Sequence, residues 1–467
     1  MQNLIVKIDR NYLIDFIYLT KSTYFYTAKR KFLTTLRKIL LAVLLSLSVS
    51  YNPGAIVKSE GMSDKIAPGN IRLINSYSSG PEFEECSKTI NSFMHKWTIA
   101  GASVAIARDG KLIYAKGFGF ADTASRIETQ PYNKFRIASI SKLITAVAIM
   151  KLQEEGRLSL DDKVFGPDGI LNDSCYLAPK DKRVFDITVG HLLSHEGGWS
   201  QRWGDQMFMP QIVAGQMKAS LPVDTKTIIR FALSKRLHFT PGTGRSYSNL
   251  GYSILGLVVE KISGIPYNDY CRWEIFEPLG IYDMEPARNM PDQKALFEVT
   301  YYEPAGMPLR PSIYGTGDMV PATYGGNDIE TLGGAGAWLA TSPDLMRLLL
   351  AVDGFSYNED MLSEESISFM TDLNNRFAPI GWKTTYIDGN WIRTGSFSGT
   401  AGMIKRQPDG ISWVVLLNSS TWNGPEIHSY IDRMMSRVLS HVREWPDHDL
   451  FNNSIPLPIR LELSGIN

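Results

Sequence analysis

The sequence predicts a mixed α+β (α/β) fold, in which one antiparallel sheet flanked by helices carries an inserted, mainly helical subdomain. Two observations predict it. Strand-like segments gather near both ends of the chain, at 102–117 and 391–418, whereas helix-like and loop-rich segments occupy the middle. Helix-like segments at 83–97 and 426–441 accompany the strands. Because a sheet must bury at least one apolar face, these helices are expected to pack against it.

The composition is that of a globular protein. The 467 residues are 44% hydrophobic and 21% charged, which is enough to bury a large core as one domain or two interleaved subdomains. The 48 basic residues balance the 48 acidic ones, so the chain lacks the basic excess typical of nucleic-acid binding. We therefore expect no nucleic-acid partner.

The cysteines argue against a zinc site and against a dense disulfide framework. Cys86, Cys175 and Cys271 are widely spaced and form no C-x-x-C. One disulfide with one free thiol remains an alternative. Three small buried residues are the favoured interpretation.

The N-terminal region has the pattern of an export signal. Basic residues at 29–31 and 37–38 precede an uncharged run at 39–49, and small residues follow at 48–50. The run is too short to span a bilayer comfortably. We expect residues 1–50 to be a signal peptide or an uncleaved signal anchor, and the protein to be periplasmic or extracellular. Membrane contact is expected only through an uncleaved signal. Residues 51–80, rich in Gly, Ser, Pro and Asn, are expected to be a linker.

The elements of the first half follow from periodicity and turn chemistry. Apolar residues at helical spacing predict a helix over 83–97. The segments 102–107 and 112–117 predict a hairpin, because Asp109-Gly110 between them favours a tight turn. An apolar run over 139–153 predicts a buried helix that Gly156 ends.

The second half returns to strands. Between 157 and 330, helical stretches such as 252–262 alternate with loops, including an irregular region at 303–327. Further elements are expected as a helix at 342–350, strands at 391–394, 400–406 and 412–418, and a last helix at 426–441. These elements predict a domain over 81–443, with a sheet subdomain at 81–136 and 331–443, a helical subdomain at 137–330 and a tail at 444–467.

Three short motifs carry the chemistry. In Ser139-Ile140-Ser141-Lys142, the serine and the lysine are three residues apart and share a helix face, so Lys142 can take the proton of Ser139 as its oxygen attacks a carbonyl. Burial would favour the neutral amine that this step needs. Tyr247-Ser248-Asn249 is the only Y-x-N of the chain, and Arg393-Thr394-Gly395 follows well downstream.

With these motifs, the chain resembles the penicillin-recognising serine hydrolases over about residues 82–440, in the branch of class C β-lactamases, D-alanyl-D-alanine carboxypeptidases and β-lactamase-like esterases. Further segments that carry the resemblance are Phe135-Arg136-Ile137-Ala138, Leu192-Leu193-Ser194-His195 with Gly197-Gly198, Phe239-Thr240-Pro241-Gly242, and Gly395 to Thr400. The resemblance implies a β-lactamase/transpeptidase-like fold with the active site in a cleft between its two parts.

The resemblance also implies an activity. It suggests an exported hydrolase without metal or cofactor, which cleaves an amide or ester bond of a small or peptide-like substrate through an acyl-enzyme on Ser139. Ser139, Lys142 and Tyr247 would be catalytic, and Tyr247 would relay the proton to the leaving group. Whether Lys142 or Tyr247 is the general base stays open, as does the choice between β-lactamase, carboxypeptidase, D-amino-acid peptidase and esterase activity. A non-catalytic peptidoglycan- or β-lactam-binding protein of the same fold is the alternative.

The remaining motif residues would bind substrate. Asn249 would orient Lys142 and donate to a substrate carbonyl, and the backbone N–H groups of Ser139 and Ser396 would form the oxyanion hole. Gly395 would let the substrate pass close to its strand. Thr394 belongs to the same strand motif.

Arg393 departs from the commonest form of the third motif, which has lysine or histidine there. An arginine stays charged and can bind a carboxylate at two points, so Arg393 predicts an anionic substrate. His191 and His195 lie four residues apart, but without H-E-x-x-H a metal site is disfavoured. Gly333 to Gly336 lacks the Lys-Ser/Thr of a phosphate loop and is expected to form a close-packed wall near the cleft.

Overall fold

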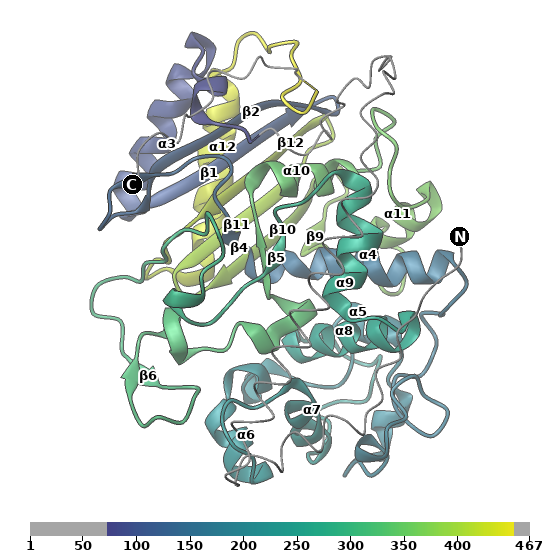
Figure 1. The fold of residues 1–467 in the computed structure, drawn as a ribbon. Helices are drawn as coiled ribbons and strands as arrows, with labels where there is room; N and C mark the ends of the chain where they lie inside the picture. Colours follow the sequence, from purple (N-terminus) through teal and green to yellow (C-terminus); the bar gives the residue numbers. More distant parts are fainter. Residues whose placement is uncertain (1–71, 453–467) are drawn as a thin grey trace, which may run out of the picture. The chain divides into compact units, whose positions relative to one another are not determined.

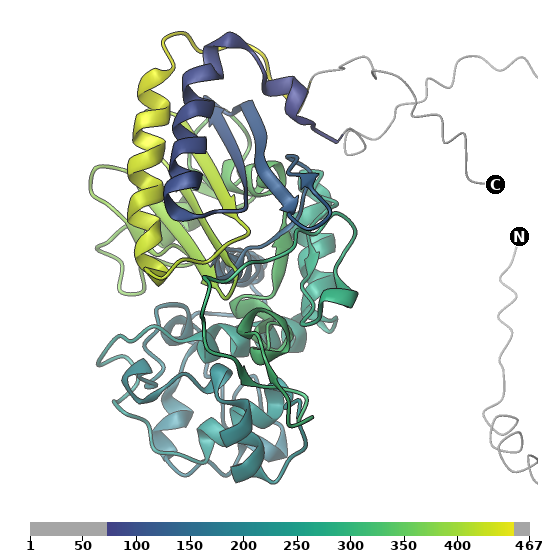
Figure 2. The ribbon, with the colours of Figure 1, turned by 90° about the vertical axis from the view of Figure 1, so that its left-hand side faces the viewer.

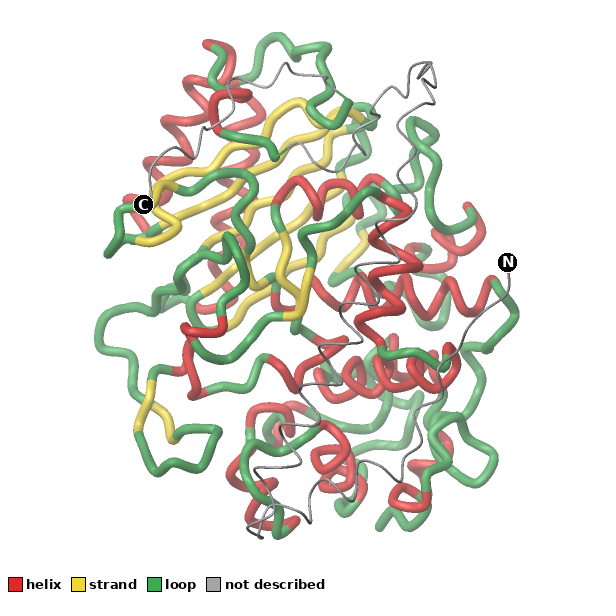
Figure 3. The backbone as a smooth tube through the Cα atoms, viewed as in Figure 1, coloured by secondary structure: helices red, strands yellow, loops and turns green. Residues whose placement is uncertain are grey.

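A computed structural model describes residues 72–452 of the chain and shows a seven-stranded antiparallel sheet built from both halves of the sequence (Figures 1 and 3). The strand order is β3-β2-β1-β12-β11-β10-β9. The strands are β1 (Gly101–Arg108), β2 (Lys111–Asp122), β3 (Ile127–Glu128), β9 (Thr384–Thr385), β10 (Trp391–Phe397), β11 (Thr400–Arg406) and β12 (Ile411–Leu417). Because β1 pairs with β12, the early and late strands meet in the middle of the sheet. The predicted mixed fold with an antiparallel sheet is confirmed.

Helices cover the sheet and fill the region beside it. The α-helices are α3 (Glu84–Trp97), α4 (Ser141–Glu154), α5 (Val189–Leu193), α6 (Pro210–Met217), α7 (Thr225–Leu233), α8 (Asn249–Ser263), α9 (Tyr267–Cys271), α10 (Ser342–Leu350), α11 (Glu364–Thr371) and α12 (Ile427–His441). Helices α3 and α12 lie side by side on one face of the sheet (Figure 2). Their apolar residues share a core with that face, whereas α4 and α10 belong to the larger core on the other face. Two separate cores thus hold the sheet from both sides.

The β1–β2 hairpin shows why the sequence turns where it does. Asp109 and Gly110 have φ angles of 50° and 77°, and such positive angles favour Asp, Asn and Gly. The alternating apolar residues of the hairpin then face the two cores. Seven residues of β1 pair with β12, which fixes the register of the central strands.

Smaller strands frame the segment that leads to Ser139. Strand β4 (Phe135–Arg136) pairs with β8 (Trp338–Ala340), and β8 also pairs with β5 (Glu285–Pro286). A ribbon of β6 (Arg310–Pro311) and β7 (Met319–Val320) lies in the region expected to be irregular. The range 137–330, expected to be a helical subdomain, therefore contains short strands, of which β5 pairs with β8 of the 331–443 segment in a separate three-stranded sheet.

Two terminal assignments differ from the structure. Residues 75–78, expected in a linker, form a short 3₁₀ helix, because Asn75 bonds to Gly117 and Thr129 and the hydroxyl of Ser78 accepts the N–H of Ala115. Residues 447–450, expected in a tail, dock on β2 through Asp449 and Leu450. Side-chain bonds to backbone order both segments, and apolar periodicity does not detect such bonds. The predicted signal at 1–50 lies outside the described residues, as do most of the linker and the tail.

The three cysteines are free thiols. Cys86 and Cys271 are buried, but Cys175 is exposed, so the expectation of three buried residues is wrong for Cys175. It sits in a short 3₁₀ turn among loop residues, where hydrophobicity alone does not force burial. Within residues 72–452, none of the helices is both long and apolar enough to cross a membrane.

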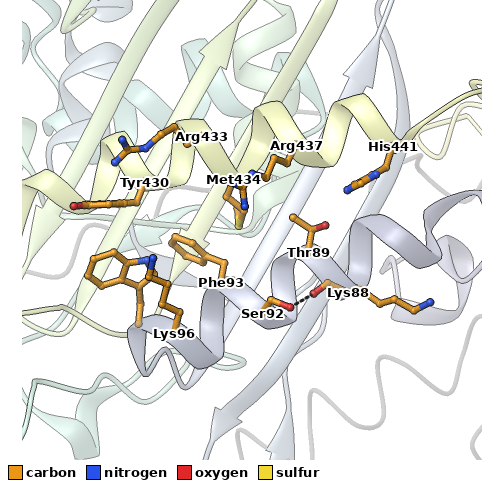
Figure 4. A pocket seen from close by; sticks show the side chains of 11 residues that line it. Lys88, Thr89, Ser92, Phe93, Lys96, Tyr430, Arg433, Met434, Arg437 and His441 are labelled. Carbon is orange, nitrogen blue, oxygen red and sulfur yellow. Dashed lines mark hydrogen bonds between the residues drawn. The ribbon is translucent and has the colours of Figure 1, made fainter.

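A groove of about 610 Å³ runs between α3 and α12 on the outer side of the sheet (Figure 4). Its floor includes Phe93 and Met434, and its basic side chains come from both helices. The groove shares no lining residue with the cavity at Ser139 described below.

Candidate active site

Ser139 lies on a strained turn that joins β4 to α4. The turn is a 3₁₀ helix, η5 (Ala138–Ile140), and α4 begins only at Ser141. Ala138 has a φ of 47°, an unusual angle for a residue with a side chain, and such strain often marks functional sites. Ser139 is half-buried, whereas its neighbours Ala138 and Ile140 are buried. The turn therefore presents the hydroxyl of Ser139 at the edge of the core.

Lys142 lies directly behind this hydroxyl. Its side chain is fully buried, and Nζ lies 3.3 Å from Ser139 Oγ, 2.7 Å from Asn249 Oδ1 and 2.6 Å from the carbonyl oxygen of Ala335. Two carbonyl oxygens thus hold two N–H bonds of the amine. The third direction faces Ser139, where an ammonium would donate and a neutral amine would accept.

Tyr247 is the second polar group at Ser139. Its hydroxyl donates a 2.6 Å hydrogen bond to Ser139 Oγ, and its ring centroid lies 4.8 Å from Lys142 Nζ. The segment that bears Tyr247 is held by His195, whose carbonyl oxygen accepts from Ser246 N and whose Nδ1 accepts from Ser248 N. His195 therefore positions the tyrosine from both sides.

Burial and charge set the protonation of this pair. Burial, reinforced by the charge of Arg393, lowers the pKa of Lys142 to about 8, although Tyr247 and Asp205 oppose the shift. Burial raises the pKa of the Tyr247 phenol, but the charges of Lys142 and Arg393 together outweigh it and lower that pKa overall. Burial also holds the pKa of His195 well below its usual value, with Lys142 and Arg393 adding to the effect. His195 is therefore a neutral acceptor at neutral pH.

Asn249 begins α8 and is 8% exposed. Its Oδ1 accepts from Lys142, as expected for a residue that orients the lysine. Its Nδ2 donates a 2.7 Å hydrogen bond to Asp205 Oδ2, which the sequence did not indicate. Only one N–H of this amide is then left for a substrate carbonyl.

Arg393 of β10 is almost completely buried, with 2% of its surface exposed. Its Nε donates a 2.7 Å hydrogen bond to the carbonyl oxygen of Ser139. Its Nη2 is buried and finds no partner among the described residues. Arg393 thus contacts the nucleophile's own backbone, a contact that the sequence did not predict.

The neighbouring glycine has a packing role. A Cβ on Gly395 would lie 2.0 Å from the carbonyl oxygen of Ile137, so only glycine lets β10 approach η5. This close approach brings Arg393 to Ser139. The structure therefore explains Gly395 by backbone packing, whereas the sequence suggested substrate clearance.

These groups meet in a cavity of about 330 Å³. Of the residues predicted from the sequence, Ser139, Tyr247, Asn249, Arg393, Thr394 and Ser396 line it. Lys142 lies behind Ser139, and Gly395 is the residue of β10 that packs against the carbonyl oxygen of Ile137. Residues that the sequence did not single out are Gln201, Phe208, Leu332, Lys383, Pro425 and His428, whereas Phe397 belongs to the segment from Gly395 to Thr400. These six residues lie outside the short motifs, because segments far apart in the chain bring them to the cavity.

The glycine-rich segment at 333–336 forms part of the wall. Ala335 and Gly336 line the cavity, and Ala335 supplies a carbonyl to Lys142. A Cβ on Gly334 would meet the Thr145 hydroxyl at 2.9 Å and the Tyr252 carbonyl at 3.0 Å. Close packing at Gly334 thus lets its neighbour reach the buried lysine.

The two histidines at 191 and 195 have other partners. His191 Nδ1 accepts from Thr188 N, and its Nε2 lies 3.0 Å from Arg376 Nη2. His195 Nδ1 accepts from Ser248 N. Both side chains are thus used to hold loops. In the part of the chain from 72 to 452, no three His, Cys, Asp or Glu residues are grouped as metal ligands.

Known proteins resemble this chain in sequence. The Beta-lactamase family model matches residues 87–431. Protein flp of Staphylococcus aureus is 28% identical over 201 residues, which are 42% of this chain and 36% of that protein. The chain thus spans about a third of the length of this relative. The putative penicillin-binding protein PbpX of Bacillus subtilis is 26% identical over 313 residues, 67% of each protein.

Solved structures resemble it in fold. The octameric penicillin-binding protein homologue from Pyrococcus abyssi has a TM-score of 0.56 and 28% identity, with 78% of this chain and 79% of that chain covered. A D-amino acid amidase from Ochrobactrum anthropi has a TM-score of 0.59 and 19% identity, with 78% and 99% covered. At that identity, the likeness to the amidase shows the fold alone.

Proposed function

The chain belongs to the beta-lactamase family, and from this premise we propose that it is a serine hydrolase that cleaves an amide or ester bond through an acyl-enzyme on Ser139. One observation carries the proposal. Ser139 Oγ lies at a cavity within hydrogen-bond distance of both Lys142 Nζ and Tyr247 OH. A serine hydroxyl is a weak nucleophile without such a partner.

The chemistry begins with the loss of the Ser139 proton. As Oγ forms a bond to the substrate carbonyl carbon, the proton passes to the Lys142–Tyr247 pair, whose pKa values are both lowered. Lys142 and Tyr247 each shift the pKa of the other, and we therefore assign the role of general base to the pair. When the tetrahedral intermediate collapses, Tyr247 returns the proton to the leaving amine or alcohol. Water then attacks the acyl-enzyme by the reverse of these proton transfers.

The substrate is proposed to be small or peptide-like and to carry a carboxylate. The cavity is lined by the cationic residues Lys383 and Arg393. Lys383 is exposed at this lining, whereas Arg393 is buried and bonded to Ser139. We assign the direct contact with a substrate carboxylate to Lys383. The positive charge of the buried Arg393 would attract the same carboxylate without touching it. Phe208 and Phe397, whose ring centroids are 6.1 Å apart, provide apolar surface beside it.

Acylation of Ser139 is the decisive test. The protein is incubated with a fluorophosphonate or a labelled penicillin, and the modified peptide is identified by mass spectrometry. An adduct on Ser139 is expected for the native chain, and Ser139→Ala should show none. A folded native protein that forms no adduct on Ser139 with any acylating probe would instead favour the non-catalytic binding protein.

A substrate panel separates the activities within this class. Nitrocefin, p-nitrophenyl acetate and a D-Ala-D-Ala peptide represent β-lactamase, esterase and carboxypeptidase activity. Turnover of each is measured for the native chain and for Ser139→Ala. The proposed hydrolase is expected to turn over at least one of them, and loss of that activity in the variant assigns it to Ser139.

A further inference from the structure

A carboxylate that no motif contains lies behind Asn249. Asp205 is half-buried and comes just before the 3₁₀ helix η9 (Gln206–Phe208), where its Oδ1 accepts a 3.0 Å hydrogen bond from Met207 N. Its Oδ2 accepts from Asn249 Nδ2 at 2.7 Å and from Gln201 Nε2 at 3.3 Å. All three bonds come from amides. The shortest of them points toward the buried lysine.

The amide of Asn249 bridges two opposite charges. Its oxygen lies 2.7 Å from Lys142 Nζ and its nitrogen lies 2.7 Å from Asp205 Oδ2. A side-chain amide has one accepting end and one donating end. A flipped amide would place its NH₂ against the lysine and its oxygen against the carboxylate, and both contacts would be repulsive. The carboxylate therefore selects one orientation of Asn249.

We propose that Asp205 is a positioning residue of this hydrolase, which locks the Asn249 amide with its oxygen toward Lys142 and places a negative charge beside the cations of the site. The inference rests on the proposed function. Asp205 is absent from the cavity lining and acts through Asn249. It is thus distinct from the residues that contact the reacting atoms.

The negative charge of Asp205 lies near several groups that surround Lys142. Lys142 Nζ lies 4.8 Å from the ring centroid of Tyr247 and 5.6 Å from that of Tyr252. Arg393 and the neutral His195 also lie near it. Burial lowers the pKa of Lys142 to about 8, and the carboxylate of Asp205 opposes that shift.

The effect of Asp205 on the Lys142 pKa fixes the direction in which the pH dependence should move when Asp205 is replaced. An anion favours the ammonium form, so removal of the charge lowers the pKa of Lys142 further. More of the lysine is then neutral at a given pH. The rising limb of the acylation rate against pH should therefore move to lower pH.

Two substitutions of Asp205 separate its two roles, the orientation of the Asn249 amide and the negative charge near Lys142. Asp205→Asn removes the charge and keeps one accepting oxygen, which can take the place of Oδ2 toward Asn249 and so preserve the lock, while its NH₂ gives up the bond from Met207 N. Asp205→Ser keeps the cap on Met207, since serine is a good N-cap residue, but is too short to reach Asn249. Asp224 supplies matched controls, because it caps α7 through a 2.7 Å bond from Thr227 N. Asp224→Asn and Asp224→Ser make the same changes at another helix.

Acylation of Ser139 is measured from pH 5 to pH 10 on the full chain. Asp205→Asn should keep most of the maximal rate and shift the rising limb by roughly half to one unit toward lower pH. Asp205→Ser should lose roughly 10- to 100-fold in rate at every pH, because the lysine is no longer held in place. The Asp224 variants should match the native protein. Native rates and an unshifted limb in both Asp205 variants would overturn the inference.

A second measurement needs no substrate. The Lys142 side chain is titrated by NMR in ¹³C-lysine-labelled native protein and in Asp205→Asn, with its signal assigned by its loss in Lys142→Arg. A lower pKa in Asp205→Asn supports the inference, and an equal pKa overturns it. If Ser139 is never acylated, the proposed function fails, but this titration still decides the role of Asp205.

Discussion

Arg393 Nε donates a 2.7 Å hydrogen bond to the carbonyl oxygen of Ser139, so the cation of the third motif holds the backbone of the residue expected to attack the substrate. This contact is independent of any charge on the substrate. Lys383, by contrast, is exposed at the cavity lining, where a substrate carboxylate can meet it.

Paired substrates should therefore distinguish the two cations. On an acid and its methyl ester, Lys383→Ala is expected to reduce kcat/KM only for the acid, by roughly 2- to 5-fold, because an exposed ion pair contributes at most about 1 kcal/mol. Arg393→Ala is expected to reduce kcat/KM for both, since it frees the Ser139 turn. The measurement is kcat/KM on the pair of substrates, with Lys235→Ala, at an exposed lysine of the loop that follows α7, as the control. Equal losses on acid and ester in Lys383→Ala would contradict its assignment.

The pH dependence of acylation should reflect the Lys142–Tyr247 pair. Because burial lowers the pKa of Lys142 to about 8, the acylation rate should rise with pH and level off above that value. Tyr247→Phe removes the 2.6 Å bond to Ser139 and should lower the rate by about 100-fold or more. Stopped-flow acylation across pH checks both expectations. A flat profile between pH 6 and pH 9 in the native protein would contradict the assignment of the base.

A methyl group at Gly395 should push β10 away from the turn that carries Ser139. The Cβ of Gly395→Ala would lie 2.0 Å from the Ile137 carbonyl oxygen, a backbone atom that cannot move aside cheaply. We expect a loss of about 1–3 kcal/mol in the free energy of unfolding, together with slower acylation. Gly215→Ala in α6 is the control, since nothing lies within 4 Å of its Cβ. Urea unfolding of both variants measures the difference, and equal stability would refute the packing role.

The sequence predicts the parts of this site that lie in contiguous motifs. Ser139 and Lys142 share one turn, and helical spacing alone brings them together. The main strands and the helices α3, α8, α10 and α12 likewise follow from periodicity, caps and turn residues. Those signals are local, so they are visible in a single sequence.

The remaining parts of the site depend on long-range packing. Asp205 reaches Asn249 only because η9 lies against α8, and Ala335 reaches Lys142 only because Gly334 packs on Tyr252. No periodicity reports such contacts between segments far apart in the chain. For the same reason, the sequence identified Arg393 as a cation but could not place its guanidinium under Ser139.

A buried acid away from the site should limit stability at neutral and higher pH. Asp344 lies in the first turn of α10, its Oδ2 is buried without a partner among the described residues, and burial, reinforced by Asp283, raises its pKa to about 7 from 3.8. Because the folded pKa is raised, the protonated acid stabilises the fold fully below about pH 4. This contribution is lost as pH rises through 7.

Asp344→Asn has nearly the same shape but cannot ionise. It should therefore match the native free energy of unfolding near pH 4 and exceed it at pH 8 by about 1–4 kcal/mol, since each unit of pKa shift corresponds to about 1.4 kcal/mol. Urea unfolding at pH 4, 6 and 8 measures this, with Asp168→Asn, an exposed loop position, as the control for net charge. A stability difference that does not change between pH 4 and pH 8 would show that the buried carboxyl does not titrate in this range.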